Sequence, residues 1–292
     1  MVAVRATRAG LLALLALACS SFGAGAFMSP RSDPAAGASD RSPHLVWLDR
    51  FQGRAGQPPD SSKWRYDVGG GGWGNHELER YTRRAANARL DGRGHLVVIA
   101  HSGNHAGPSG GRRYTSARLK TLGRFSFRYG RVAARMRVPA GRGLWPAFWM
   151  LGANIGRVGY PRCGEIDVME VLGQDPRTVY GTVHGPGPDL DRGIGGKLTA
   201  PRSLARGFHV YAASWTPNRV RFSLDGKTYE TVRRSTYPRR DVWALDHRMF
   251  ILLNLAVGGW PGPPNRATHF PGRLKVDWVR VWQDAAGQRK VT

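Results

Sequence analysis

Three carboxylates lie within six residues of an otherwise apolar stretch, Gly-Glu-Ile-Asp-Val-Met-Glu at residues 164–170. Burying acids without partners is costly, so we interpret this stretch as a polar face built for a purpose. Glu165, Asp167 and Glu170 could supply a nucleophile, an assisting group and an acid, which is the set that glycoside hydrolysis uses. A solvated acidic strand is the plainer interpretation, but the residues between the acids are apolar.

The spacing of these acids determines whether they can act together. Alternate residues of a strand share a face, so Glu165 and Asp167 point one way and Glu170 would point the other. One extra residue, a β-bulge at Val168-Met169, would return Glu170 to the common face. The Cα atoms of Glu165 and Glu170 would then be roughly 13 Å apart, at about 3.3 Å per residue. Side chains leaning towards each other leave about 5 Å between carboxyl groups, near the separation in a retaining glycosidase.

This motif resembles the signature of glycoside hydrolase family 16, in the bulged form of laminarinase-like endo-β-1,3-glucanases. Further blocks between about Val46 and Trp282 are similar to those of the family and follow its order. They are Trp-Gly-Asn-His-Glu-Leu at 73–78, Tyr-Thr-Ser-Ala-Arg-Leu at 114–119, Trp-Pro-Ala-Phe-Trp-Met-Leu at 145–151, Tyr-Gly-Thr-Val-His-Gly at 180–185 and Leu-Asn-Leu-Ala-Val-Gly-Gly at 253–259.

The resemblance implies a fold, a reaction and a set of roles. The fold is all-β, a β-jelly-roll sandwich of two antiparallel sheets with a concave substrate cleft. The reaction is endo-acting, retaining cleavage of internal β-1,3-glucosidic bonds in laminarin-type glucan, and also in mixed-linkage β-1,3/1,4 chains. Glu165 is then the nucleophile, Glu170 the acid/base and Asp167 the assisting group. The chemistry is consistent with this, because the nucleophile must be ionised and the acid must hold its proton.

Eight further residues are predicted to bind substrate. The tryptophans offer flat apolar platforms for a sugar ring, and one of them follows four glycines that allow close approach. The polar members lie in apolar or aromatic blocks, where they need partners such as sugar hydroxyls. Core packing or structural hydrogen bonding is the alternative for each. They are Trp73, Asn75, Glu77, Arg118, Trp145, Trp149, His184 and Asn254, and the resemblance places His184 on the leaving-group side.

Short strands separated by Gly- and Pro-rich turns must position these groups, and long helical periodicity is missing. Asp225-Gly226 is typical of a hairpin turn. Strands are predicted at residues 95–101, 129–138, 165–172, 209–215, 219–224, 250–256 and 274–282. One catalytic domain over residues 44–285, with a tail at 286–292, accounts for them, because all-β domains of this size occur as single units.

The first residues predict export. Arg5 and Arg8 precede an apolar run at 11–18 that is too short to span a bilayer. Residues 1–26 form a signal peptide ending at an Ala-Gly-Ala site, or residues 1–18 are removed and Cys19 is lipidated. Residues 27–43 are a flexible linker rich in Ala, Gly, Ser and Pro. We therefore expect a secreted protein, extracellular or periplasmic, with Cys19 as its one potential membrane attachment. Cys163 should be a small packed residue beneath the cleft floor.

The net charge of +24 is extreme and is carried mainly by Arg. The basic residues are scattered and no nucleic-acid motif is visible, so we expect no nucleic-acid partner. Two interpretations remain: a generally basic exported enzyme, or attraction to an anionic wall, capsule or sulfated polysaccharide. The expected partner is the β-glucan substrate, bound by a monomer.

No cofactor or catalytic metal is expected, and one departure from the family concerns a structural metal. Relatives often carry an acid at the position of Arg50, which helps to hold a structural Ca²⁺ together with a late Asp that matches Asp277. Calcium needs oxygen ligands, so Arg50 predicts that this site is lost or altered and that Asp277 pairs with Arg50 instead.

Three alternative functions use the same fold. The first is hydrolysis of a galactan such as agar or carrageenan, which the positive charge would favour if the polymer were sulfated. The second is a transglycosylase with the same catalytic residues. The third is a non-catalytic β-glucan-binding protein, which is disfavoured because such relatives usually lose the catalytic carboxylates and this chain keeps all three.

Overall fold

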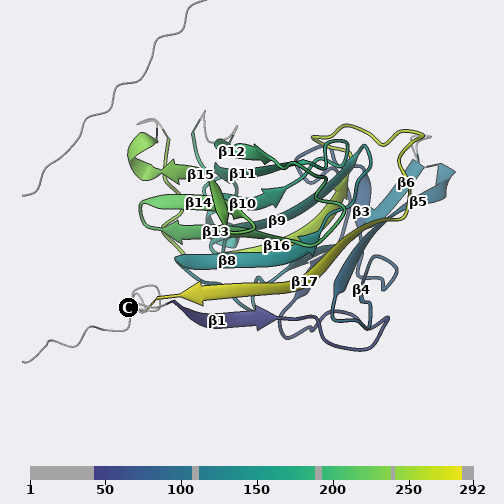
Figure 1. The fold of residues 1–292 in the computed structure, drawn as a ribbon, viewed down its shortest axis with the longest axis horizontal. Coiled ribbons are helices and arrows are strands. Elements are labelled where there is room, and N and C mark those ends of the chain that lie inside the picture. The colour runs from purple at the N-terminus through teal and green to yellow at the C-terminus, as the bar shows by residue number, and fades with distance from the viewer. Residues whose placement is uncertain (1–42, 107–111, 188–192, 238–240, 285–292) are drawn as a thin grey trace, which may run out of the picture. The chain divides into compact units, whose positions relative to one another are not determined.

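The computed structural model describes residues 43–106, 112–187, 193–237 and 241–284, and their strands form two sheets (Figure 1). The ten-stranded sheet has the order β15-β14-β13-β8-β17-β5-β6-β3, with β1 paired to β17 and β4 to β5. The seven-stranded sheet has the order β12-β11-β10-β9-β16-β7-β2. Neighbouring strands are antiparallel except β3 and β6, which are parallel.

The strands of the larger sheet are β1 (His44–Asp49), β3 (Glu79–Tyr81), β4 (Ala88–Leu90), β5 (Leu96–Ala106), β6 (Arg112–Ser116), β8 (Gly130–Arg137), β13 (His209–Thr216), β14 (Arg219–Leu224), β15 (Lys227–Arg233) and β17 (Gly272–Gln283). Those of the smaller sheet are β2 (Arg65–Asp67), β7 (Arg118–Lys120), β9 (Leu144–Gly152), β10 (Glu165–Glu170), β11 (Thr178–His184), β12 (Ile194–Thr199) and β16 (Met249–Val257).

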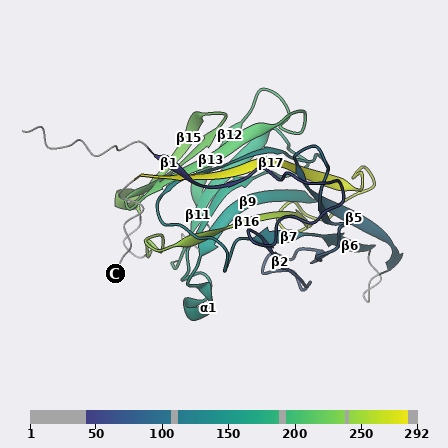
Figure 2. The ribbon, with the colours of Figure 1, turned by 90° about the horizontal axis from the view of Figure 1, so that it is seen from below.

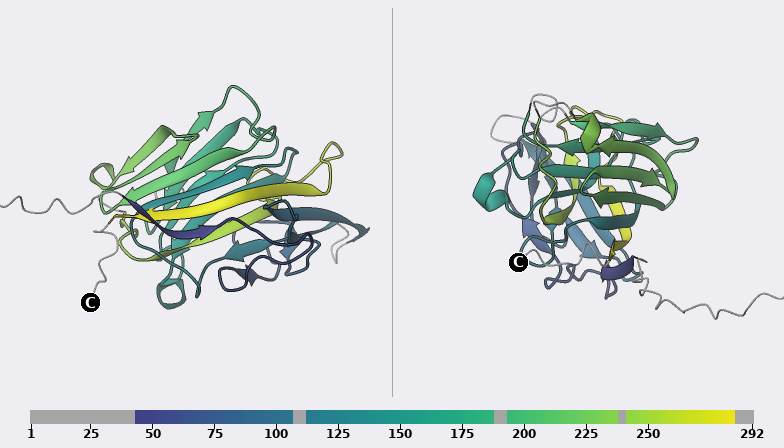
Figure 3. Two further views of the ribbon diagram at one scale, coloured as in Figure 1. Left: turned by 60° about the horizontal axis from the view of Figure 1, so that its bottom comes forward. Right: turned by 90° about the vertical axis from the view of Figure 1, so that its left-hand side faces the viewer.

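The two sheets stack as layers with the apolar core between them (Figure 3). Strand alternation builds this core, because every second side chain of a strand points to the same face. Val132 and Ala134 of β8 face inward from the larger sheet, and Phe148 of β9 and Ile166 of β10 face inward from the smaller one. Full burial of a side chain the size of Phe148 contributes about 1.5–3 kcal/mol. The outer face of the smaller sheet is therefore left free to carry polar groups.

All seven predicted strands are present, with ends that differ by a few residues. The predicted hairpin joins β14 to β15, and Asp225 and Gly226 have φ angles of 48° and 82°. Positive φ at both central residues is the geometry of a type I′ turn, which matches the right-handed twist of the strands. The predicted all-β sandwich is confirmed.

Helical structure in the described part of the chain is short. Helix α1 (Ile155–Val158) follows β9 and lies outside the sheets (Figure 2), and a 3-10 turn, η1 (Arg234–Thr236), follows β15. Among the described residues, no helix has the length and apolar character needed to cross a membrane.

Several predictions about the ends of the chain fall outside the described residues. These are the signal peptide, lipidation of Cys19, almost all of the linker, and the tail. Cys163 is fully buried beside Leu151, Phe250 and Leu252, which confirms the prediction of a packed residue. Burial raises the pKa of its thiol to about 11, so it is not a reactive thiolate.

Candidate active site

The predicted bulge is present in β10. Against β9, Asp167 lies opposite Trp149 and Met169 opposite Phe148, so one residue of β10 has no counterpart. Against β11, the register shifts between Asp167 and Glu170. Ile166, Val168 and Met169 pack into the core, while the three acids turn to the outer face of the sheet. The extra residue therefore places Glu165, Asp167 and Glu170 on one surface, as the spacing predicts.

These acids face a cleft with a volume of about 620 Å³ on the outer face of the smaller sheet. Neighbouring strands supply its floor, because residues directly opposite in register share a face. Glu165 lies opposite His184 of β11, and Asn254 of β16 lies opposite both Ala147 and Arg118. All eight residues predicted to bind substrate line this cleft, namely Trp73, Asn75, Glu77, Arg118, Trp145, Trp149, His184 and Asn254.

Each catalytic candidate contacts a side chain of a neighbouring strand or of its own strand. Trp145 Nε1 donates a hydrogen bond to Glu170 Oε1 at 3.0 Å. His184 Nε2 lies 3.1 Å from Asp167 Oδ2. Asp167 is also hydrogen-bonded to Glu165. Asp167 therefore links the nucleophile candidate to a histidine that the sequence suggested only as a subsite contact.

Burial sets the protonation of these groups. Burial raises the pKa of Glu170 to about 7, with His184 and the Trp145 hydrogen bond opposing the shift and Glu165 adding to it. Burial, and after it the charge of Asp167, raises the pKa of Glu165 well above its usual range. Burial also raises the pKa of Asp167. A hydrogen-bonded pair of buried acids can share one proton, while Glu170 keeps its own near neutral pH.

His184 supplies positive charge to this acidic surface. Burial alone would lower the pKa of its ring, but contact with Asp167 and the charges of all three acids raise the pKa to about 10. The imidazolium is therefore retained at neutral pH and partly offsets the negative charge of the acids.

A hydrogen-bond chain orients the polar groups at the other end of the cleft. Trp149 Nε1 donates to Asn254 Oδ1 at 2.7 Å, and Asn254 Nδ2 donates to the Tyr81 hydroxyl at 3.1 Å. The Tyr81 hydroxyl donates to Glu77 Oε2 at 2.7 Å. Buried polar side chains with satisfied partners hold one orientation, so Glu77 and Asn254 present fixed polar groups to the cleft.

Arg118 is held between an acid and two aromatic rings. Its Nε lies 3.1 Å from Asp67 Oδ2, and its guanidinium carbon lies 5.0 Å from the Trp73 ring centroid and 4.6 Å from that of Trp149. A guanidinium stacks well on aromatic faces while its edge stays available for hydrogen bonding. Trp73 itself has a φ angle of 49°, so the loop after the glycines holds it in a left-handed conformation.

Sequence reasoning missed several residues of the cleft. Trp260 is 51% exposed and packs edge-on against Trp145 and Tyr180, at ring distances of 6.0 and 4.8 Å. Its signal was present, since it directly follows the Gly-Gly end of the 253–259 block. Thr182 and Tyr160 also line the cleft, but no sequence pattern distinguishes them.

The predicted partner of Asp277 is wrong. Asp277 pairs with Arg135 of β8, and the side chain of Arg50 is exposed. The register explains this, because Arg135 lies opposite Trp278, the next residue along β17, where that strand is irregular. Within the described ranges, no group of three or more His, Cys, Asp or Glu side chains is arranged to hold a metal ion.

An all-β sandwich with paired carboxylates and several tryptophans lining one cleft is typical of a glycoside hydrolase. The model of glycosyl hydrolases family 16 matches residues 80–280. A β-glucanase of Rhodothermus marinus is 43% identical over 84% of this chain and 87% of its own length. A glucan endo-1,3-beta-glucosidase of Cryptopygus antarcticus is 36% identical over 82% of this chain and 91% of its own. The chain therefore belongs to glycosyl hydrolase family 16.

Solved structures agree with this assignment. The catalytic domain of an endo-1,3-beta-glucanase (laminarinase) from Thermotoga petrophila superposes with a TM-score of 0.77 at 40% identity, covering 84% of this chain and 99% of that one. The laminarinase from Rhodothermus marinus superposes with a TM-score of 0.74 at 41% identity, covering 84% of this chain and 99% of that one. At such identities the likeness extends beyond the fold to the enzyme family.

Glu79 is a buried acid next to Glu77, and its protonation state in the folded protein can be tested. It is 2% exposed and accepts the Val257 N–H at 2.6 Å. Burial, and after it Glu77, raises the pKa of Glu79 from 4.5 to about 9. The folded state therefore keeps a proton that the unfolded state loses above about pH 4.5. The free energy of unfolding should fall by about 1.4 kcal/mol per pH unit between these values and level off above them.

We expect Glu79→Gln to remove this pH dependence, because glutamine resembles the neutral acid and can still accept the Val257 N–H. The melting temperature of the variant, relative to the unmodified protein, should rise steadily from pH 5 to pH 9. Glu230→Gln, on the edge strand β15, is the matched control. Parallel pH curves for Glu79→Gln and the unmodified protein would show that Glu79 is ionised in the fold.

Proposed function

We propose that this enzyme is an endo-acting, retaining hydrolase that cleaves internal β-1,3-glucosidic bonds of β-glucan by double displacement. The observation that carries the proposal is the bulge in β10, which brings three acids to the floor of one cleft. The names of the relatives and solved neighbours support the choice of β-1,3-glucan as substrate. We extend the proposal to mixed-linkage β-1,3/1,4 chains, since a neighbour from the same family is described as a non-specific endo-β-1,3(4)-glucanase.

The first displacement uses Glu165 and Glu170 on opposite sides of the bond. Asp167 accepts the shared proton from Glu165, and the ionised Glu165 then attacks the anomeric carbon. Glu170, still protonated near its pKa of about 7, gives its proton to the leaving glycosidic oxygen. The product is a covalent glycosyl-enzyme with one chain end released.

The second displacement regenerates the enzyme. Glu170, now ionised, takes a proton from water as that water attacks the anomeric carbon, and Glu165 leaves. The Trp145 hydrogen bond stabilises the ionised form of Glu170 in this step. Two inversions at one carbon give net retention of configuration.

Substrate specificity is tested by incubating the full chain with laminarin, lichenan, agarose and carrageenan and measuring new reducing ends. We expect activity on laminarin, with oligosaccharides of several lengths at early times because cleavage is internal. Cleavage of agarose but not of laminarin would overturn the choice of β-1,3-glucan as the substrate. Release of a single short product from the start would overturn endo action.

His184 should set the pH dependence of this reaction. In His184→Gln a neutral side chain replaces the cation, so Glu170 and the Glu165–Asp167 pair should both hold their protons to higher pH. Both limbs of the pH profile of kcat/KM should therefore move upward by about one unit, the usual effect of removing an adjacent opposite charge. An unmoved profile would show that His184 does not face these acids as a cation.

Export is also part of the proposal, and it rests on the leader of the sequence alone. Mass spectrometry of the mature N-terminus distinguishes cleavage after residue 26 from lipidation of Cys19. A mature protein that keeps residues 1–18 would contradict both.

A further inference from the structure

The outer face of the larger sheet carries a second chemical surface. In β8 and β14, the core side chains alternate with arginines that must point away from the core. Cross-strand register extends the set, because Arg233 lies opposite Arg219 and Arg280 lies opposite Ala133 on the same face. We call this set the basic face; it consists of Arg131, Arg135, Arg219, Arg221, Arg233 and Arg280.

The basic face lies on the far side of the sandwich from the catalytic cleft. The cleft is on the outer face of the smaller sheet, and the core separates the two surfaces. A polymer bound to the basic face would therefore leave the cleft open.

The charges of the basic face are largely uncompensated. Within the described ranges, only Arg135 of the six forms an ion pair, with Asp277. Arg219 and Arg233 lie directly opposite each other, although like charges in that arrangement destabilise a sheet. Repulsion between these two arginines lowers the stability of the sheet, and no ion pair among the described residues offsets it. We therefore infer that the cations serve to bind a ligand.

Three of the six arginines lie over aromatic rings, and two of these rings are tryptophans. The guanidinium carbon of Arg280 lies 4.2 Å from the ring centroid of Trp278, and that of Arg131 lies 5.3 Å from that of Trp282. Stacking fixes the plane of a guanidinium but leaves its N–H edge able to bind an oxyanion with two hydrogen bonds. Arg280 Nε is buried and has no hydrogen-bond partner among the described residues.

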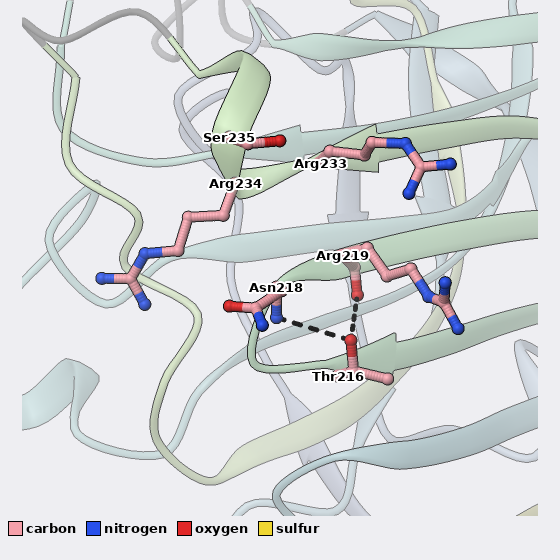
Figure 4. A pocket seen from close by; sticks show the side chains of 6 residues that line it. All are labelled: Thr216, Asn218, Arg219, Arg233, Arg234 and Ser235. Carbon is pink, nitrogen blue, oxygen red and sulfur yellow. Dashed lines mark hydrogen bonds between the residues drawn. The ribbon is translucent and has the colours of Figure 1, made fainter.

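A cavity of about 580 Å³ lies at one end of the basic face, between β14 and η1 (Figure 4). Arg219 and Arg233 project to the same side there, whereas Arg234 projects away and pairs with Asp246 at 3.1 Å (Figure 4). Thr216 Oγ1 donates to the carbonyl of Arg219 at 3.4 Å, which ties the two strands together at this end. The site thus offers two guanidinium groups beside a hollow surface.

The arrangement favours an extended acidic polysaccharide over nucleic acid. Adjacent strands are about 4.8 Å apart and alternate residues of one strand about 6.6 Å apart, so the arginines form rows along which an extended chain with regularly spaced anions can lie. The rows include the hydroxyls of Ser214 and Thr231, cross-strand neighbours of Arg221 that can bond sugar hydroxyls. Each of the two tryptophan rings of the face already has an arginine over it, which leaves less ring surface for the base stacking that single-strand binders use.

We propose that the basic face binds an acidic polysaccharide, a sugar chain bearing carboxylate or sulfate groups, and so holds the enzyme in a matrix where its neutral substrate occurs. The charge raises the local concentration of the anionic chain by long-range attraction. Retention near the substrate needs no contact with the cleft. The binding step involves no cleavage, so it stands apart from the proposed activity.

The test measures binding of the full chain to immobilised polygalacturonate and dextran sulfate, with uncharged dextran and double-stranded DNA as comparison surfaces. The variant carries Arg219→Ser, Arg221→Ser and Arg233→Ser. The matched control carries Arg54→Ser, Arg124→Ser and Arg202→Ser, three exposed arginines outside the basic face, and so has the same net charge. Activity on a short neutral oligosaccharide checks that both proteins are folded.

We expect the variant to lose about tenfold or more in affinity for an acidic polysaccharide, and the control about twofold or less. The relative affinities for polygalacturonate and dextran sulfate identify carboxylate or sulfate as the preferred group. Equal losses in the two triple variants would show that net charge alone drives binding and would overturn the site. Tighter binding to DNA than to both acidic polysaccharides at equal ionic strength would overturn the choice of ligand.

Discussion

Replacing Glu165 by glutamine should lower kcat for laminarin by about 10⁴-fold or more, the usual scale for loss of an enzymic nucleophile. Glutamine preserves the shape of the side chain and a hydrogen bond to Asp167, but its amide cannot form the glycosyl-enzyme. Because the cleft and the Trp149–Asn254 hydrogen bond are untouched, KM should change little. Initial rates of reducing-end release, with the melting temperature as a check on folding, measure the effect.

Two variants show whether this loss is specific. Asp167→Asn should cost less than Glu165→Gln, because it removes a proton acceptor and not the bond-forming atom. Glu230→Gln, the same chemical change away from the cleft, should leave the rate unaltered. A Glu165→Gln enzyme as active as the unmodified one would overturn the nucleophile assignment.

Azide can distinguish the two roles stereochemically. With Glu165→Ala and an activated aryl β-glucoside oligomer, azide can occupy the vacated space and attack once, giving an α-glycosyl azide. With Glu170→Ala, azide would instead attack the glycosyl-enzyme from the opposite face, giving the β product. NMR of the products reads the configuration, and the reverse pattern would exchange the two assignments.

The second large effect is expected at Glu170. Glu170→Gln should lower kcat/KM for laminarin by about 10²–10⁴-fold, the range of general acid–base catalysis. For an aryl glycoside whose leaving group needs no proton, the glycosylation step should be much less affected. The difference between the two substrates, measured on the same protein, isolates proton donation from binding.

The pH profile should change with the same substitution. Burial raises the pKa of Glu170 to about 7, and the acid must be protonated to act, so kcat/KM of the unmodified enzyme should fall as the pH rises through about 7. Glutamine does not titrate, so this alkaline limb should vanish in Glu170→Gln. Persistence of the same limb in the variant would assign it to another group.

The catalytic centre could be predicted from sequence because its geometry is local. The side-chain period of a strand is two, so the odd spacing of Glu165 and Glu170 requires one extra residue for a common face. The bulge at Val168 satisfies that requirement. The same period places Trp145 and Trp149 together, and the Asp-Gly pair predicts the β14–β15 hairpin.

Contacts between distant segments could not be predicted in this way. Asn254 donates to Tyr81, 173 residues away, and Asp277 pairs with Arg135, 142 residues away. Each depends on which strands become neighbours and in what register. The expectation that Asp277 would pair with Arg50 failed because Asp277 lies at the irregularity of β17, beside Arg135 of β8.

The sequence by itself determined the chemistry, namely three acids, their order and the distortion that turns them to one face, because these depend on residue type and strand period. The tertiary structure alone decided their electrostatics, since the imidazolium beside Asp167 and the burial of Glu170 arise from packing β9 and β11 against β10. It also decided that scattered arginines form one basic face. Local periodicity fixes which way a side chain points, but only strand pairing fixes what it meets.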